Sequence, residues 1–333
     1  MNKIRVVVTD FVEADLKWEE EKARELGFVL NYFQCKNASA HELIDICSEA
    51  DVVVVNMARF NKEVIQGLTK TRLIIRHGIG YDNVDVGATN EQGIMFGYIP
   101  DYCVTEVAEQ TLMLLFACQR KLVTQLEILR RSAVSGQWDF RSIYPLYSLS
   151  GKTVGIVGIG RIGSTVFRML QGMGVKVVVY DPFLGEDRAR ALGVSPISLD
   201  VLLKTADIVT IHCPLDREET YHMFDMPQFK LMKHSAILIN TSRGAIVNLI
   251  ALDQALREGE IALAGIDVYE EEPPPADLAL LSNDKALCVP HLSWLSEEAS
   301  WNIREKIMQD IKRYISGLPP VYQVNKSEVS FPA

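Results

Sequence analysis

Residues 152–182 read KTVGIVGIGRIGSTVFRMLQGMGVKVVVYDP and have the order strand, glycine turn, helix, strand, acid. Residues 153–157 and 175–180 are the two apolar, β-prone runs, and Asp181 closes the second. An amphipathic run predicts the helix between them. Three glycines open that helix with the spacing G-x-G-x-x-G, namely Gly158, Gly160 and Gly163.

This pattern predicts a dinucleotide site. Gly158 permits a tight turn, Gly160 lets a pyrophosphate approach the backbone, and Gly163 lets the helix pack closely on the strand. The free N–H groups at the helix start favour phosphate. Asp181 lies 18 residues after Gly163, where a carboxylate can accept from both ribose hydroxyls. A 2′-phosphate would meet like charge there, so the pattern favours NAD over NADP, with a βαβ unit that binds no cofactor as the alternative.

Length and composition narrow the class of protein. The 333 residues allow about two domains, and the charged fraction of 23% is ordinary for a globular protein. The net charge of −9 and the lack of a basic stripe argue against nucleic acid as a partner. Six scattered cysteines without a C-x-x-C pair predict no metal site and reduced thiols. With no signal-peptide pattern at the start and no apolar run of membrane-spanning length, we expect a cytoplasmic protein without a membrane partner.

Apolar strands alternate with helical patterns along most of the chain, which predicts an α/β fold with parallel sheets covered on both faces. In the first half, strands are expected at residues 4–9, 28–33, 52–55 and 73–76. In the second half, further strands are expected at residues 208–212, 236–240, 262–267 and 286–289. Residues 296–315 predict a last amphipathic helix, with Ser296 as its N-cap.

Residues 101–131 contain neither glycine nor proline and carry apolar residues at helical spacing. This pattern predicts one long helix packed in the core. A helix of this length also favours a subunit boundary, and hence a homodimer.

Three side chains suited to acid–base chemistry follow three of the expected strands. Arg243 comes after residues 236–240, the run Glu270-Glu271-Glu272 after residues 262–267, and His291 after residues 286–289. In open α/β sheets, ligands bind outside the carboxyl ends of the strands. Arginine pairs with carboxylates, and histidine transfers protons near neutral pH. Each residue also has a structural alternative, and three other histidines compete as the base: His77, His212 and His234.

The sequence resembles the D-isomer-specific 2-hydroxyacid dehydrogenases over nearly its whole length. The fragments that carry the resemblance are RHGIGYDNVD (76–85), GKTVGIVGIGRIG (151–163), YDP (180–182), ADIVTIHCPL (206–215), ILINTSRGAIVN (237–248), GIDVYEEEP (265–273) and VPHLSW (289–294). The resemblance implies two Rossmann- or flavodoxin-like domains with the active site in the interdomain cleft. It implies a discontinuous substrate-binding domain of residues 1–98 and 296–333, and an NAD-binding domain of residues 99–295.

The resemblance also assigns catalytic roles. It makes Arg243 the residue that binds the substrate carboxylate, and His291 the acid–base that exchanges a proton with the substrate oxygen. The acid that orients His291 is Glu272, directly before a proline, although the three adjacent glutamates leave room for a shift by one residue. The implied reaction is hydride transfer between NADH and C2 of a 2-oxo acid.

Further contacts follow from the same resemblance. Cofactor contacts, besides the glycines and His291, are expected at Arg161, Ile162, Asp181, Cys213, Pro214, Thr241 and Asp267. Substrate contacts, besides Arg243 and His291, are expected at Arg76, Gly78, Ile79, Gly80 and Trp294.

Arg76 and Trp294 resemble the C-terminal binding protein branch of the family, although Trp294 is also explained by plain packing. That branch contains corepressors, so an NADH-responsive scaffold with little turnover is one alternative to an enzyme. A 3-phosphoglycerate dehydrogenase is another, because Arg59 follows the third strand and can contact an anionic substrate tail.

Overall fold

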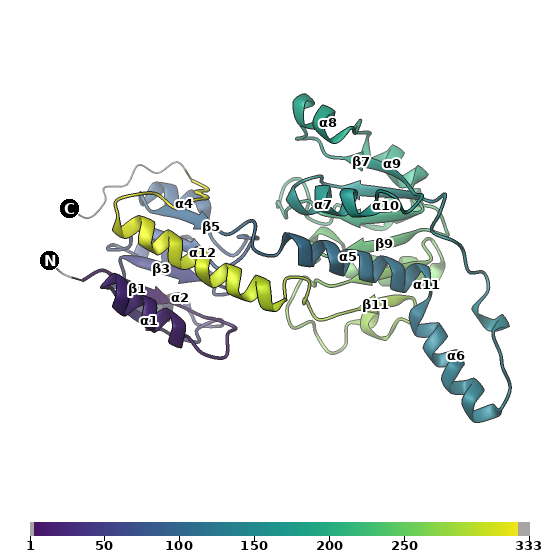
Figure 1. The fold of residues 1–333 in the computed structure, drawn as a ribbon, viewed down its shortest axis with the longest axis horizontal. Coiled ribbons are helices and arrows are strands. Elements are labelled where there is room, and N and C mark those ends of the chain that lie inside the picture. Colours follow the sequence, from purple (N-terminus) through teal and green to yellow (C-terminus); the bar gives the residue numbers. More distant parts are fainter. Residues whose placement is uncertain (1–2, 326–333) are drawn as a thin grey trace. The chain divides into compact units, whose positions relative to one another are not determined.

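The chain forms two parallel β-sheets, one in each of two units (Figure 1). The computed structural model describes residues 3–325. The first unit comprises the described residues up to Cys103 and from Leu295 onward, and the second comprises Val104–Trp294. The boundaries expected from the sequence are 98/99 and 295/296, and residues 1–2 and 326–333 of that expectation lie outside the described residues. The predicted fold class, two α/β domains with parallel sheets, is confirmed.

The first sheet has the order β2-β1-β3-β4-β5. Its strands are β1 (Arg5–Val8), β2 (Val29–Tyr32), β3 (Val52–Val55), β4 (Leu73–Arg76) and β5 (Met95–Tyr98). The chain leaves β1 for β2 on one side and continues through β3 on the other, so the strand order reverses between β1 and β3. All four valines of β3 are buried, as expected for a central strand covered on both faces.

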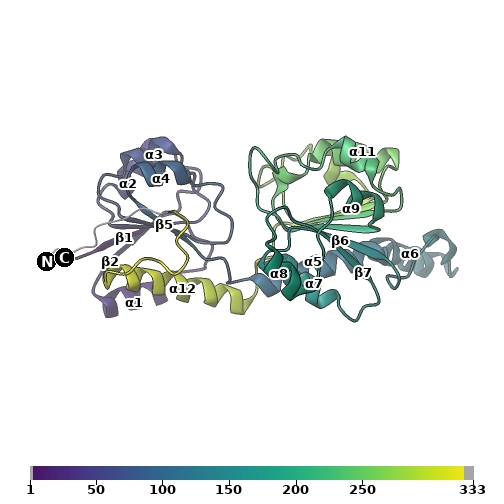
Figure 2. The same ribbon diagram turned by 90° about the horizontal axis from the view of Figure 1, so that it is seen from above.

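Helices cover both faces of this sheet (Figure 2). α2 (Ala40–Cys47), α3 (Lys62–Gly67) and α4 (Val86–Glu91) lie on one face, and α1 (Lys17–Leu26) and α12 (Glu297–Ile315) lie on the other. Helix α12 begins at the N-cap predicted from the sequence, because the Ser296 hydroxyl accepts from the Ala299 amide at 2.8 Å. It is fixed to α1 by Arg304, which makes two 2.6 Å hydrogen bonds to Glu19.

The second sheet has the order β11-β10-β9-β8-β6-β7. Its strands are β6 (Thr153–Val157), β7 (Lys176–Tyr180), β8 (Ile208–Ile211), β9 (Ile237–Asn240), β10 (Leu263–Ile266) and β11 (Ala286–Cys288). The order reverses between β6 and β8, which is the kind of point where α/β sheets bind their ligands. The helices on its faces are α5 (Val104–Gln119), α7 (Arg161–Leu170), α8 (Glu186–Leu192), α9 (Leu199–Thr205), α10 (Met226–Leu231) and α11 (Leu249–Glu258).

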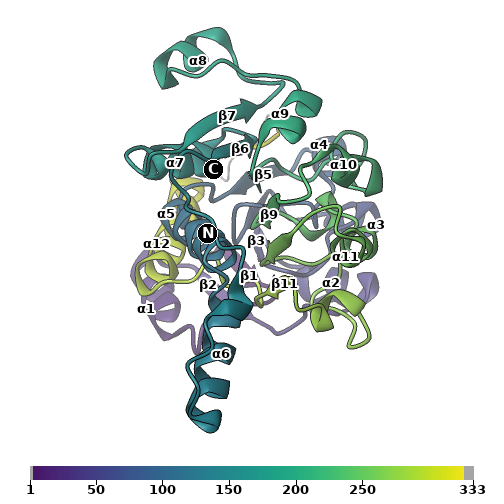
Figure 3. The ribbon, with the colours of Figure 1, turned by 90° about the vertical axis from the view of Figure 1, so that its right-hand side faces the viewer.

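The prediction of a single long helix over residues 101–131 is wrong. The structure has α5 (Val104–Gln119) and a separate α6 (Leu122–Ser135), which extends away from the second sheet (Figures 1 and 3). Between the two helices, Lys121 adopts a left-handed conformation with φ 50°. The break is supported by contacts distant in sequence, since the Gln119 amide donates to the Tyr147 carbonyl and Lys121 Nζ to the Ile143 carbonyl. No glycine or proline marks it, so local sequence carries no signal of it.

Candidate active site

The glycine turn lies at the carboxyl end of β6, where the order of the second sheet reverses. Gly158 has φ +87°, and a Cβ there would lie 2.7 Å from the Cys213 backbone nitrogen, so the turn packs directly against the end of β8. A Cβ on Gly163 would collide with the Gly158 carbonyl oxygen. Around Gly160, in contrast, a Cβ would meet no atom of the described residues within 4 Å. This open backbone at the start of α7 fits the pyrophosphate of a dinucleotide.

Asp181 lies beside this turn at the end of β7. Its Oδ2 accepts from the Ile159 amide at 2.9 Å, and its Oδ1 accepts from the Phe183 amide at 3.0 Å. The carboxylate therefore ties β7 to the glycine turn while its side chain stays partly exposed. A carboxylate fixed in this way fits the two hydroxyls of an adenosine ribose, and the site as a whole fits NAD.

The remaining predicted cofactor residues lie around the same edge of the sheet. Arg161 is exposed and Ile162 half-buried in the first turn of α7. Cys213 and Pro214 follow β8, and burial raises the pKa of the Cys213 thiol to about 12, so this thiol stays protonated. The Thr241 hydroxyl is buried against the Thr111 hydroxyl of α5 at 2.9 Å. Direct contact of these side chains with a cofactor stays a prediction.

Asp267 is predicted to contact the cofactor, and in the structure it also binds the backbone that follows His291. It is fully buried at the end of β10. Its two oxygens accept from the Leu292 amide at 3.1 Å and the Ser293 amide at 3.0 Å. The side chain therefore holds the backbone that directly follows His291.

Arg243, Glu272 and His291 come from the loops after three adjacent strands, β9, β10 and β11. Because the strands are parallel, these loops lie at one edge of the sheet. His291 Nδ1 and Glu272 Oε2 are 2.7 Å apart, and the Tyr269 amide donates to Glu272 Oε1 at 3.1 Å. Both side chains are partly exposed. His291 Nε2 is therefore the ring nitrogen that does not face Glu272.

The charge state of Glu272 follows from these neighbours. Burial of the carboxyl acts to raise its pKa, but the hydrogen bond and charge of His291, the Tyr269 amide and the Arg243 charge together lower it below the ordinary value. Glu272 is consequently a carboxylate at neutral pH. A carboxylate on Nδ1 fixes the tautomer and the orientation of the imidazole.

The structure separates the three adjacent glutamates. Glu272 contacts His291, the Glu270 carboxylate lies 3.0 Å from His222 Nε2, and Glu271 is exposed. Of the three, Glu272 is thus the one that contacts His291, and its catalytic role stays a prediction.

The competing histidines have other environments. His212 is paired with the Thr210 hydroxyl at 2.9 Å, and burial lowers its pKa to about 3, so it stays neutral. His234 is exposed, and its Nδ1 donates to the Gly259 carbonyl. His77 belongs to the first unit and lies 3.0 Å from Glu13. Burial disfavours ionisation of Glu13, but the hydrogen bond and charge of His77 bring the pKa of its carboxyl down to about 2.

The predicted substrate residues Arg76, Gly78, Ile79 and Gly80 lie at the carboxyl end of β4, in the first unit. The Arg76 guanidinium donates to Asn56 Oδ1 and Asn83 Oδ1, both at 3.3 Å, and to the His77 carbonyl. Gly78 has φ +148°, and a Cβ there would collide with this guanidinium. Trp294 belongs to the second unit and is half-buried three residues after His291. Their substrate contacts stay predictions.

Several residues that fix the loops of the predicted site residues were not among the candidates from the sequence. Asp10 is buried after β1, and its carboxylate accepts from the amides of Asn56, Met57 and Ala58, which fixes the loop after β3. Gln110, Thr111 and Tyr269 similarly support residues after β9 and β10. Most of these contacts join positions far apart in sequence, so a local pattern could not reveal them.

Within residues 3–325, no helix is long and apolar enough to cross a bilayer, and no group of three or more His, Cys, Asp or Glu side chains is arranged to hold a metal. All six cysteines are free thiols.

The comparisons with known proteins agree on one family. Residues 112–293 match the family model "D-isomer specific 2-hydroxyacid dehydrogenase, NAD binding domain". A glyoxylate reductase of Korarchaeum cryptofilum is 37% identical over 80% of this chain and 80% of its own length. A D-3-phosphoglycerate dehydrogenase of Archaeoglobus fulgidus is 35% identical over 86% of this chain. The chain spans only 54% of that protein, about half its length.

Solved structures agree with the sequence relatives. The crystal structure of a D-lactate dehydrogenase of Aquifex aeolicus, complexed with NAD and lactic acid, has a TM-score of 0.82 at 26% identity and covers 94% of this chain and 96% of that one. Together with the glycine turn, Asp181 and the paired Glu272 and His291, these matches show that the chain belongs to the D-isomer-specific 2-hydroxyacid dehydrogenase family, with residues 112–293 in its NAD-binding domain.

Proposed function

We propose that the protein is an NAD-dependent D-2-hydroxyacid dehydrogenase that interconverts a small 2-oxo acid and its 2-hydroxy acid. The 2.7 Å contact between Glu272 and His291 carries this proposal, because it prepares an acid–base histidine at the edge of the sheet that also presents the dinucleotide turn. The bound nicotinamide would supply or accept the hydride. During reduction, His291 Nε2 would give its proton to the substrate carbonyl oxygen, and it would take the proton back during oxidation.

Arg243 and Glu272 would support this proton transfer in different ways. The Arg243 guanidinium would bind the substrate carboxylate and polarise the adjacent carbonyl. Glu272 would keep the proton of His291 on Nδ1 and stabilise the imidazolium, which makes a proton available at Nε2 near neutral pH. Arg76, Gly78, Ile79, Gly80 and Trp294 would add the remaining substrate contacts.

The substrate class is proposed from the relatives and from the site residues. Curated relatives carry the names glyoxylate reductase, glycerate dehydrogenase and D-3-phosphoglycerate dehydrogenase, which supports a small 2-oxo acid such as glyoxylate or hydroxypyruvate. Exposed Arg59 keeps a phosphorylated acid as the second candidate. Arg76 and Trp294 remain the features that favour the C-terminal binding protein branch, in which an NADH-responsive scaffold is the rival function.

NADH oxidation, followed by absorbance, would test these possibilities on a panel of 2-oxo acids. The panel would include glyoxylate, hydroxypyruvate, phosphohydroxypyruvate and phenylpyruvate. We expect turnover on a small member of the panel. Tight NADH binding with no turnover on any member would refute the enzyme and favour the scaffold.

A homodimer is proposed from the apolar surface of α6 and the segment after it. Val134 and Trp138 are 91% and 75% exposed, and α6 extends away from the sheet (Figure 3). Other exposed large apolar side chains of this region are Leu122, Val123, Leu126, Leu129, Phe140, Tyr144 and Tyr147. Many exposed apolar side chains within one segment are typical of an interaction site, and a second copy of the chain would cover them. Light scattering should give twice the chain mass, and Leu129→Glu should shift the mass toward that of one chain.

A further inference from the structure

His222 connects the loop that carries Arg243 to the loop that carries Glu272. Its backbone amide donates to the Ala245 carbonyl at 2.8 Å, two residues after Arg243. Its ring Nε2 lies 3.0 Å from Glu270 Oε2, two residues before Glu272. His222 thus makes one hydrogen bond to each of the two loops, although it is itself in neither of them.

The conformation of His222 makes this connection rigid. Its backbone has φ 49°, in the left-handed region that few non-glycine residues adopt. The ring stacks on Tyr221, with centroids 4.1 Å apart and planes 17° from parallel. The backbone on its other side is held as well, since the Phe224 amide donates to the Ile246 carbonyl at 3.0 Å. The imidazole is therefore presented to Glu270 from a fixed backbone.

The two loops also touch each other directly. A Cβ on Gly244 would collide with the backbone of Tyr269 and Glu270, so these two stretches of backbone are in close contact at that point. The Tyr269 amide in turn donates to Glu272 Oε1. A shift of Glu270 would therefore move Tyr269, and through it the carboxylate that contacts His291.

We propose that His222 is a positioning residue which, through its hydrogen bond with Glu270, keeps the Glu272 carboxylate within hydrogen-bonding distance of His291. This inference rests on the proposed dehydrogenase function and assigns a task to a histidine outside the catalytic set. The contacts of His222 with Ala245 and Glu270 would carry its effect on turnover through the two loops.

Two single variants remove the hydrogen bond between His222 and Glu270 with little other change. His222→Asn removes the imidazole that contacts Glu270, and the shorter asparagine tolerates the left-handed backbone better than most residues. Glu270→Ala deletes the pair from the other side, whereas Glu270→Gln keeps an acceptor for the imidazole. Glu271→Ala is the matched control, since it removes an exposed carboxylate from the same turn.

Turnover kinetics across pH would test the proposal on the full chain. We expect His222→Asn and Glu270→Ala to lower kcat about tenfold, with KM for NADH unchanged. The double variant should lose no more than either single one, because both act through one pair. Glu270→Gln should recover most of the activity, and Glu271→Ala should behave as the unchanged protein.

The pH profile separates positioning from general weakening of the fold. The charged groups that face Glu272 are His291 and Arg243, and a looser contact with His291 lets the pKa of the Glu272 carboxyl rise. The acid limb of kcat/KM should then move to higher pH in both single variants. Mere loss of stability would lower the amount of active protein and leave the limb in place.

A crystal structure of His222→Asn gives a readout independent of turnover. We expect a separation between Glu272 Oε2 and His291 Nδ1 that is clearly longer than 2.7 Å. An unchanged separation between these two atoms would overturn the proposal. It would also be overturned if His222→Asn and Glu270→Ala had the same kcat and the same acid limb as Glu271→Ala. If the unchanged protein turns over no 2-oxo acid, the proposed function fails instead, and the crystal structure alone decides whether His222 positions Glu272.

Discussion

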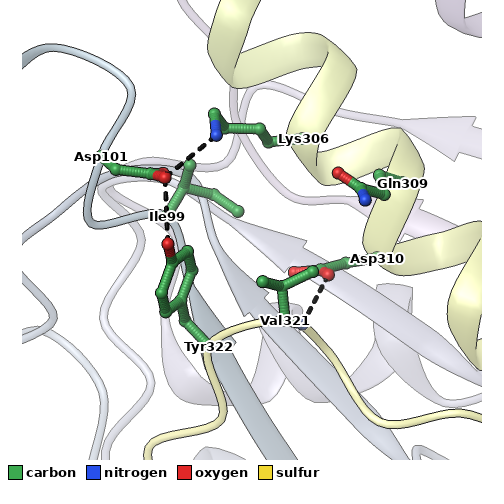
Figure 4. Close-up of a pocket in the computed structure, with 7 residues that line it drawn as sticks. All are labelled: Ile99, Asp101, Lys306, Gln309, Asp310, Val321 and Tyr322. Atoms are coloured by element: carbon green, nitrogen blue, oxygen red, sulfur yellow. Dashed lines mark hydrogen bonds and ion pairs between the residues drawn. The ribbon is translucent and has the colours of Figure 1, made fainter.

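Replacing Asp310 by asparagine is expected to stabilise the first unit at neutral pH. Asp310 lies on α12, is 1% exposed and lines a small cavity with Asp101 and Lys306 (Figure 4). Its Oδ1 accepts from the Val321 amide at 2.8 Å. Among residues 3–325, neither Asp310 Oδ2 nor Asp101 Oδ1 has a hydrogen-bond partner. A carboxyl group is thus buried with a hydrogen bond to only one of its two oxygens.

The size of the effect follows from the pKa of this carboxyl. Burial, together with the Asp101 charge, outweighs the Val321 amide and the charges of Arg313 and Lys306, and raises the pKa of Asp310 from 3.8 to about 6. The folded state therefore binds the proton more tightly than the unfolded chain does. Stability from this proton is present below about pH 4 and is lost as the pH rises through about 6. At about 1.4 kcal/mol per pKa unit, the loss approaches about 3 kcal/mol.

Asp310→Asn removes this titration and keeps the carbonyl oxygen for the Val321 amide. Its Nδ2 group would take the place of the unpartnered oxygen and supply a donor toward the cavity. Urea unfolding at pH 4.5 and pH 8 measures the difference, with hydrogen exchange in α12 identifying the first unit. We expect the variant to be about 1–3 kcal/mol more stable at pH 8, and to show only about a third of that gain at pH 4.5, where the unfolded carboxyl is already ionised and the folded one is still protonated.

A second variant keeps the test decisive. Asp310→Ala removes the Val321 contact as well and should gain less at pH 8, because it leaves that amide without its acceptor. If Asp310→Asn is no more stable than the unchanged protein at pH 8, or gains equally at both pH values, the reasoning from a raised pKa is refuted.

Four further changes test the site and the fold. His291→Ala should lower kcat about 10²–10⁴-fold while leaving NADH affinity intact, as titrated by fluorescence; survival of turnover would contradict the proton-transfer role. Glu272→Gln should lower kcat/KM and abolish the acid limb that reports this carboxyl, in a rate profile from pH 4 to pH 9. Asp181→Ala should weaken NADH at least about tenfold relative to NADPH, because a ribose acceptor and a negative charge are both lost; equal losses for both cofactors would argue against that role. Glu19→Ala should cost about 1.5–3 kcal/mol in urea unfolding by leaving half-buried Arg304 without its carboxylate partner, and a joint Glu19→Leu and Arg304→Met replacement should recover most of it.

Most strands and the dinucleotide turn could be predicted from sequence because their signals are local. Val52–Val55, Leu73–Arg76 and Thr153–Val157 begin and end where their apolar runs do. The spacing of Gly158, Gly160 and Gly163 has steric reasons that the structure makes visible. Some elements were missed: Gly97 interrupts the short run MFGY of β5, and α8, with the sequence EDRARAL, has no buried face.

The catalytic candidates could be predicted from their positions after strands and from the family resemblance. The residues that hold these candidates in place could not be predicted. Strand ends placed Arg243, the three glutamates and His291 at one edge of the sheet, and family resemblance selected Glu272. The pairing of His222 with Glu270 joins positions 48 residues apart, and the helix break at Lys121 depends on carbonyls more than twenty residues away. Such contacts depend on the tertiary fold, which a single sequence does not display.

Three contacts support different parts of the candidate site in the second unit. Asp267 holds the backbone after His291, Tyr269 holds Glu272, and His222 holds Glu270. None of the three lies at the glycine turn, which is fixed separately by Asp181 and by its packing on β8. Changes to the supporting contacts should therefore affect the alignment of His291, and hence kcat, more than the affinity for NADH. The dinucleotide turn and the Glu272–His291 pair are supported separately at one edge of the sheet. We therefore expect that a change to one of them can leave the other intact.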